Sequence, residues 1–185
     1  MKEQSIHEII DLYLDKWVKA GLNSLPRVLE PEMADPYQDS SEEWKTWFPI
    51  PSQVSDSEIR DFEEQIGHVL PSDYKVLLRY KHFYELAISE ATFTAHPIRR
   101  WRYFLSEMIF DGYPREFLAD KGLLAFASWS DWGLLCFDTN RNDGESNYPV
   151  VQWDHELPHG FQDFAPNFFQ ALLQLDADAK ANAED

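Results

Sequence analysis

The sequence predicts an α+β domain in which helices cover a mainly antiparallel sheet of about four to six strands. Helical periodicity dominates the first half of the chain, whereas short apolar runs separated by turn residues dominate the second half. A final amphipathic stretch then closes the chain. The 185 residues contain no internal repeat and no linker between folded halves, so we expect one main domain.

The first 46 residues predict a helix followed by an acidic irregular segment. Ile6, Tyr13 and Trp17 recur at helical spacing, and Gly21 ends the predicted helix. From Glu30 to Glu43 the chain carries six acids and no base, and its prolines interrupt any helix. We expect residues 1–46 to pack on the main domain.

The next stretch predicts two helices, a strand-like segment and a further helix. Ser55 and Glu58 form a capping box, and the helix that they start ends at Gly67. Three elements then follow, namely a helix opened by Leu70 and Pro71, the strand-like residues 85–96 and the helical residues 99–110.

The C-terminal half predicts strands and one last helix. The apolar runs at 123–128, 133–138 and 148–154 alternate with turn residues, which favours antiparallel hairpins. For the last helix, Asp163 is the candidate N-cap and Pro166 lies in the first turn. Its expected buried face consists of Phe164, Phe168, Leu172 and Leu175, and residues 176–185 form a polar tail.

The charge balance favours some partners and disfavours others. The chain has 16 Lys and Arg against 33 Asp and Glu, a formal net charge of −17. A phosphate backbone or an anionic membrane would therefore be repelled at long range, whereas a basic partner would be attracted. The alternative is that the charge only keeps the protein soluble. Cys136 is the single cysteine, so we expect no intrachain disulfide, a structural thiol and a cytoplasmic protein.

The stretch "HELPH", residues 155–159, matches the HExxH zinc motif. That motif needs a helix, because only helical spacing places both imidazoles on one metal ion. Pro158 disfavours a helix here, and the preceding residues predict a strand. We therefore expect no metal site, and a small zinc hydrolase that uses His155 and His159 is kept as a remote alternative.

The series of elements resembles a known family. "SDSEIRDFEEQIGHVLPSDYKVLLRY", residues 55–80, is similar to the N-terminal signature of the SUKH superfamily, and residues 123–138, 148–156 and 161–175 resemble its later strands and closing helix. The chain departs from the usual pattern at residues 81–83 and 131–133. The positions that match the N-terminal signature are Glu63, Gly67, Leu70, Pro71, Tyr74, Leu78 and Tyr80.

The resemblance implies a single SUKH-like domain over residues 47–175, with an N-terminal helical extension. It also implies a bacterial immunity protein, without enzymatic activity or cofactor, that binds and neutralises a cognate protein toxin such as a nuclease. A basic toxin suits the acidic charge. The alternative is a regulatory or scaffold module of the same fold.

The candidate partner-binding residues are chosen for loop position and for charge or aromatic character. They are Asp131, Trp132, Asp143 and Glu145, together with the acidic segment from Glu30 to Glu43. The toxin, the oligomeric state and the role of residues 1–46 do not follow from these patterns.

Overall fold

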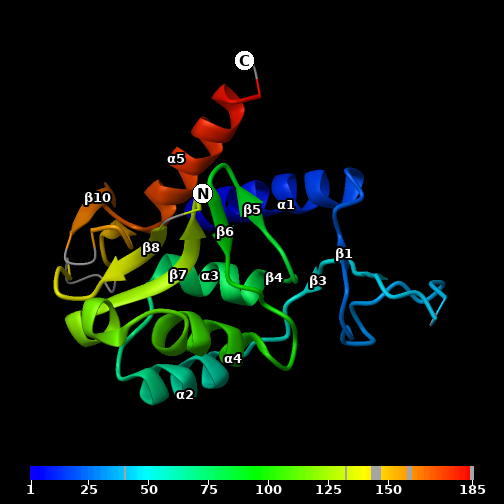
Figure 1. Cartoon of the computed structure of the whole chain (residues 1–185), viewed down its shortest axis with the longest axis horizontal. Coiled ribbons are helices and arrows are strands. Elements are labelled where there is room, and N and C mark those ends of the chain that lie inside the picture. The colour runs from blue at the N-terminus through cyan, green and yellow to red at the C-terminus, as the bar shows by residue number, and fades with distance from the viewer. Residues whose placement is uncertain (40, 132, 143–146, 158–159, 184–185) are drawn as a thin grey trace.

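The computed structural model describes residues 1–39, 41–131, 133–142, 147–157 and 160–183 (Figure 1). Its helices are α1 (Lys2–Lys19), α2 (Asp56–Ile66), α3 (Ser72–Tyr80), α4 (Trp101–Ser106), the π-helical turn η1 (Glu107–Asp111), the 3-10 turns η2 (Arg115–Phe117) and η3 (Ala119–Lys121), and α5 (Phe168–Ala181). Its strands are β1 (Ser24–Leu25), β2 (Lys45–Thr46), β3 (Ile50–Pro51), β4 (Lys81–His82), β5 (Ala87–Ile88), β6 (Ala91–Phe93), β7 (Leu123–Trp129), β8 (Gly133–Asp138), β9 (Val150–Asp154) and β10 (Phe161–Ala165).

One antiparallel sheet forms the centre of the molecule. Within the described residues, six strands pair in the order β10-β9-β8-β7-β6-β5, and every neighbouring pair is antiparallel. The short ladders β1-β2 and β3-β4 lie outside this sheet. The predicted α+β fold with a mainly antiparallel sheet is confirmed.

Side chains from both faces of the sheet are buried, which explains why its strands are apolar without strict alternation. Leu124 and Phe126 of β7 enter the main core, whereas Leu123 and Ala125 enter a smaller core on the other side. A register shift between Ala125 and Ala127 then places Phe126 and Ala127 in the same core. The smaller core is closed by residues from η1 and from the segment that follows it, namely Met108, Tyr113 and Phe117.

Aromatic side chains fill the main core. The rings of Phe126 and Phe137, on neighbouring strands, stack with centroids 4.2 Å apart. Tyr74 from α3 and Phe168 from α5 meet edge to face at 5.2 Å. Such pairs add to the large apolar area that each ring removes from water, so the high aromatic content serves the core.

Helix α1 belongs to the main core. Ile6, Ile10 and Leu14 are fully buried, which confirms the helical stripe. Helix α1 also makes polar contacts with α3. The Lys2 ammonium lies 3.0 Å from Asp73, and the Tyr80 hydroxyl donates to Asp11 at 2.6 Å. The first helix is thus bound to α3 by packing and by polar contacts.

The start of the last helix differs from the prediction. Residues 161–165 form β10 against β9, and Asn167 rather than Asp163 caps α5 by accepting a hydrogen bond from the Gln170 N–H at 2.9 Å. Asp163 instead pairs with Arg141 at 2.6 Å. Phe164, expected on the helix, packs from β10 against Trp129. Pro166 lacks an N–H, so it separates the strand from the helix cap.

Two histidines form a buried pair between β4 and the segment before α4. His82 is fully buried, and His96 is 3% exposed. The Gln53 N–H donates to Nε2 of His82 at 2.9 Å, so the neutral ring carries its proton on Nδ1, 3.0 Å from the His96 carbonyl oxygen. Burial lowers the pKa of His82 and lowers that of His96 to about 3. Both imidazoles are therefore neutral at pH 7.

Candidate partner-binding site

Asp131 is the one of the four single candidate residues that the structure describes. It is exposed in the tight turn between β7 and β8, next to Ser130. The Ser130 N–H donates to the Glu90 carbonyl oxygen at 2.8 Å, so this turn lies beside the β5-β6 turn. Trp132, Asp143 and Glu145 lie outside the described residues.

The HExxH stretch does not begin on a helix. His155 and Glu156 form a turn directly after β9, and the Glu156 N–H donates to Asp154 at 2.8 Å. Pro158 and His159 lie outside the described residues. Among the residues that are described, no group of three or more histidine, cysteine, aspartate or glutamate side chains could hold a metal ion. The zinc alternative thus lacks, at His155, the helical geometry on which it depends.

Cys136 lies in the middle of β8 and is fully buried. Burial raises the pKa of its thiol well above the ordinary value, so the thiolate is disfavoured. This agrees with a structural role for the thiol.

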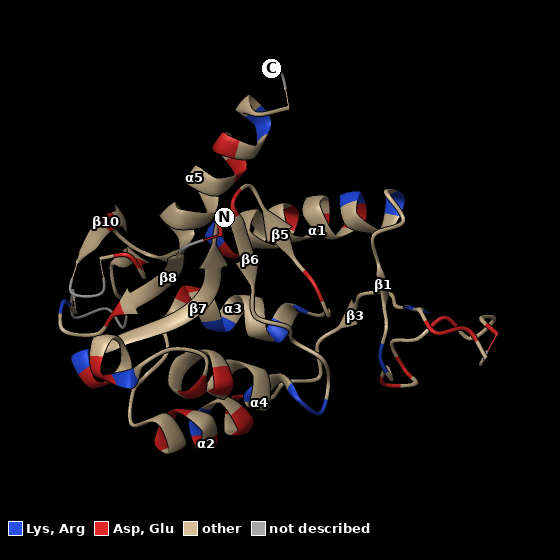
Figure 2. Ribbon diagram, in the orientation of Figure 1, with Lys and Arg blue, Asp and Glu red and all other residues tan. Residues whose placement is uncertain are grey.

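The predicted acidic segment forms an arm that extends from the body of the molecule. We call residues 30–48 the acidic arm; Figure 1 shows it projecting beyond β1, and Figure 2 shows acidic residues along it. Buried side chains hold its base, since Trp47 is fully buried and Met33 is 1% exposed. The Trp47 N–H donates to the Asn23 carbonyl oxygen at 2.9 Å, and the Asn23 amide returns a bond to the Trp47 oxygen at 2.6 Å.

One glutamine connects the two sides of the arm near its tip. The side-chain oxygen of Gln38 accepts from the Thr46 N–H at 2.6 Å, and its amide nitrogen donates to Glu42 at 2.9 Å and also to the Trp44 carbonyl oxygen. Ser41 donates its N–H and its hydroxyl to Asp39, both at 2.8 Å. These short-range bonds order a segment that has little core of its own.

The arm presents aromatic side chains to solvent. Tyr37 is 95% exposed, Trp44 is 56% exposed and Phe48 is 40% exposed. Exposed tryptophan and tyrosine are the residue types that most often supply binding energy at protein interfaces. Placed among carboxylates, they make the surface of the arm both acidic and partly apolar.

Five of the six carboxylates of the arm fall into two groups, and the sixth, Asp39, accepts the hydrogen bonds from Ser41. Glu30 and Glu32 near the base face Arg99, which lowers the pKa of Glu32 to about 2. Towards the tip, Asp35, Glu42 and Glu43 form no ion pair with any residue that the structure describes. Their negative charge is therefore available to a partner.

A family comparison supplies the identity of the domain. The model of the SMI1 / KNR4 family (SUKH-1) matches residues 53–174, well over half of the chain. The chain belongs to the SUKH-1 family. No curated protein matches its sequence. None of the helices in the described part of the chain is long and apolar enough to cross a membrane.

The structure explains the SUKH-1 signature in physical terms. Ser55 and Glu58 form the predicted capping box, and Gly67 ends α2 with φ +72°, a conformation that favours glycine. The Glu63 carboxylate accepts a hydrogen bond from the Leu70 N–H at 2.7 Å, which fixes the turn between α2 and α3. These matched positions shape helix α2 and the turn that leads to α3.

The acidic arm precedes the residues that match SUKH-1. Its charge is evident from the sequence, whereas Tyr37, Trp44 and Phe48 are not among the predicted site residues. The available signal was the presence of aromatic residues within and directly after an acidic, proline-interrupted segment. Trp47 is the same residue type as Trp44 but is buried, and only the three-dimensional structure distinguishes their roles.

Proposed function

We propose that this SUKH-1 chain is a non-enzymatic immunity-type protein that binds and neutralises a basic protein toxin. The observation that supports this most is the acidic arm, which combines exposed aromatic rings with carboxylates that form no ion pair within the described residues. A nuclease is the toxin class that the charge favours, because a surface that grips phosphate is basic.

Electrostatic attraction and aromatic contacts have separable roles in this proposal. The net charge of −17 speeds the approach of a basic partner, and the arm directs it to one end of the molecule. Trp44 then supplies the apolar contact that holds the complex. The charge acts mainly on the association rate, and the ring acts mainly on the dissociation rate.

The test uses the product of the neighbouring gene, co-expressed and purified with this chain. Combining Asp35→Asn, Glu42→Gln and Glu43→Gln should slow association on the order of tenfold at low salt, and added salt should shrink the difference. The matched control combines Asp111→Asn, Glu64→Gln and Glu116→Gln, three exposed acids on other elements with the same total charge change. Equal slowing by both triples would contradict a localised site.

Trp44→Ala should raise the dissociation rate and weaken the complex by about 2 kcal/mol. Phe161→Ala, which removes an exposed ring from β10, serves as the control and should leave affinity unchanged. Protection of cells against the neighbouring gene product should fall with the same variants. A stable complex without any such protection would instead favour the regulatory or scaffold alternative.

A further inference from the structure

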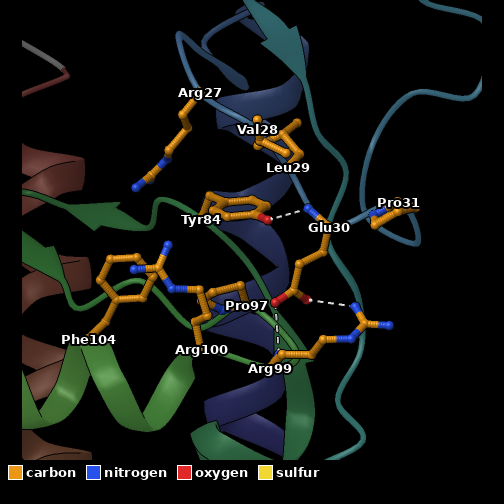
Figure 3. Close-up of a pocket in the computed structure, with 10 residues that line it drawn as sticks. All are labelled: Arg27, Val28, Leu29, Glu30, Pro31, Tyr84, Pro97, Arg99, Arg100 and Phe104. Carbon is orange, nitrogen blue, oxygen red and sulfur yellow. Dashed lines mark hydrogen bonds and ion pairs between the residues drawn. The ribbon is translucent and has the colours of Figure 1, made fainter.

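A pocket of about 540 Å³ lies where the base of the acidic arm meets the segment before α4. This volume is within the range of small-ligand sites in proteins. We call it the arginine pocket; Figure 3 shows its lining side chains. They are Arg27, Val28, Leu29, Glu30, Pro31, Tyr84, Pro97, Arg99, Arg100 and Phe104.

The pocket reverses the charge balance of the chain. Acids outnumber bases two to one overall, as 33 against 16, yet three arginines and one glutamate line this pocket. Arg99 is matched by Glu30 and Glu32. The guanidinium groups of Arg27 and Arg100 form no hydrogen bond and no ion pair with the residues that the structure describes. Glu85 is near enough to affect Arg27 electrostatically, but no ion pair links them.

Both unmatched guanidinium groups lie near the ring of Phe104. Arg27 lies 5.7 Å and Arg100 lies 4.9 Å from the centroid of the Phe104 ring. Arg27 is also 5.3 Å from the centroid of Tyr84. Cation–π contacts offset part of the repulsion between two like charges, but they do not use the N–H donors of the guanidinium edges.

Tyr84 adds a third donor. Its hydroxyl oxygen accepts a hydrogen bond from the Glu30 N–H at 2.7 Å, which leaves the O–H proton to donate. Tyr84 is 5% exposed, and burial raises the pKa of its phenol, so the proton is retained at neutral pH. Two guanidinium groups and one phenol therefore offer donors without a matching acceptor.

The pocket wall already shows how a carboxylate is received here. The Arg99 N–H donates to one Glu30 oxygen at 2.9 Å, and the Arg99 guanidinium lies 3.7 Å from the other. Leu29, Pro97 and Phe104 give the pocket an apolar part as well. We propose that the arginine pocket binds the carboxylate of an apolar organic acid, with Arg27 and Arg100 on the carboxylate and the apolar wall on its body.

This assignment is independent of toxin binding by the arm. One side of the pocket comes from residues 27–31, which precede the SUKH-1 match at 53–174, and the other side comes from residues within that match. The site is therefore a property of this chain in addition to the family domain.

The test is calorimetric titration of the full chain with 3-phenylpropionate. We expect a Kd on the order of 1 mM or tighter for a ligand of this size. The uncharged 3-phenylpropionamide should bind at least tenfold more weakly, because it lacks the carboxylate, and inorganic phosphate should bind more weakly because it lacks the apolar body. Equal binding of acid and amide, tighter binding of phosphate, or no binding of the acid would overturn the assignment.

Substitutions localise the binding. Arg27→Gln and Arg100→Gln should each weaken 3-phenylpropionate at least fivefold. Arg60→Gln, which removes an exposed arginine on α2, should have no effect. Unchanged melting temperatures would show that each variant folds. Equal affinity in all three variants would overturn the role of these arginines.

A second titration, with peptides, identifies the source of the acid. A short peptide that ends in phenylalanine is compared with its C-terminally amidated form. Tighter binding of the free-acid peptide than of 3-phenylpropionate supports a peptide C-terminus as the ligand, and binding of 3-phenylpropionate alone supports a small acid. Equal binding of the two peptides would overturn carboxylate recognition for peptides.

Discussion

The acidic arm and the arginine pocket use adjoining residues but present opposite charges. On the arm, carboxylates near the tip point to solvent with few partners, and short-range hydrogen bonds order the backbone. In the pocket, the guanidinium groups lie over aromatic rings in a concave site. The difference shows that net charge describes the approach of a partner, whereas local charge and shape describe what is bound.

Two acids form the boundary between these regions. Glu30 and Glu32 belong to the arm by sequence, but both turn to Arg99 on the pocket side. On the tip side of these two acids, the arm keeps its acidic character. On the other side, N-terminal to Glu30, Arg27 forms no ion pair with any described residue. The Arg99 pairs therefore both fasten the arm and limit the positive charge of the pocket.

The largest effect should come from the anchor that both regions share. Trp47 is fully buried and meets Tyr84 edge to face at 5.9 Å. Trp47→Ala leaves a cavity and should lower the free energy of unfolding by about 3–5 kcal/mol, measured by denaturant titration. Trp44→Ala, in the same arm but exposed, should change it by less than about 0.5 kcal/mol. Similar losses in both variants would show that the arm has no distinct anchor.

Falling pH should weaken the fold beside the arginine pocket. In the folded protein, His82 and His96 are both neutral. Below the ordinary value of 6.5 the unfolded chain takes up protons that folded His96 refuses until about pH 3. The free energy of unfolding should thus fall as pH drops below 6.5, by up to about 1.4 kcal/mol per pH unit for His96. In the arm, Arg99 lowers the pKa of Glu32 and hydrogen bonds from Ser41 lower the pKa of Asp39.

Thermal unfolding between pH 8 and pH 5 checks this expectation. His96→Leu should reduce the loss of stability on acidification, whatever its effect at pH 8. Phe83→Leu, which changes a buried neighbour without a titrating group, should keep the full pH dependence. A His96→Leu protein as acid-sensitive as the original would assign the effect to other groups.

Patterns that depend on near neighbours in sequence were predictable. The capping box at Ser55 and Glu58 and the stop at Gly67 follow from backbone chemistry within a few residues. The start of α5 was not, because Asp163 and Asn167 are both good caps and the choice depends on the pairing of β10 with β9, a long-range contact. The division into residues 1–46, 47–175 and 176–185 stays a prediction.

The candidate site was predictable only in part. The acidic segment from Glu30 to Glu43 was visible as composition, and its role in binding a partner stays a prediction. The arginine pocket was not visible, because Arg27, Tyr84 and Arg100 are far apart in sequence and no spacing relates them. A run of acidic residues along one segment can be read from the sequence. The meeting of basic residues that are distant in sequence can be seen only in the folded structure.

The smallest effect should come from removing one charge where the acidic arm meets the arginine pocket. Glu32→Gln removes one of the two carboxylates that pair with Arg99, leaving Glu30, and keeps the shape of the side chain. The freed guanidinium would add positive charge at the pocket, so 3-phenylpropionate should bind about two- to threefold more tightly, the size expected of one screened ion pair. Glu43→Gln removes the same charge from an arm residue without an ion pair among the described residues, and should leave the affinity unchanged. If both variants tighten binding equally, the acid senses only the net charge of the arm; if only Glu32→Gln does, Arg99 sets the boundary between the two sites.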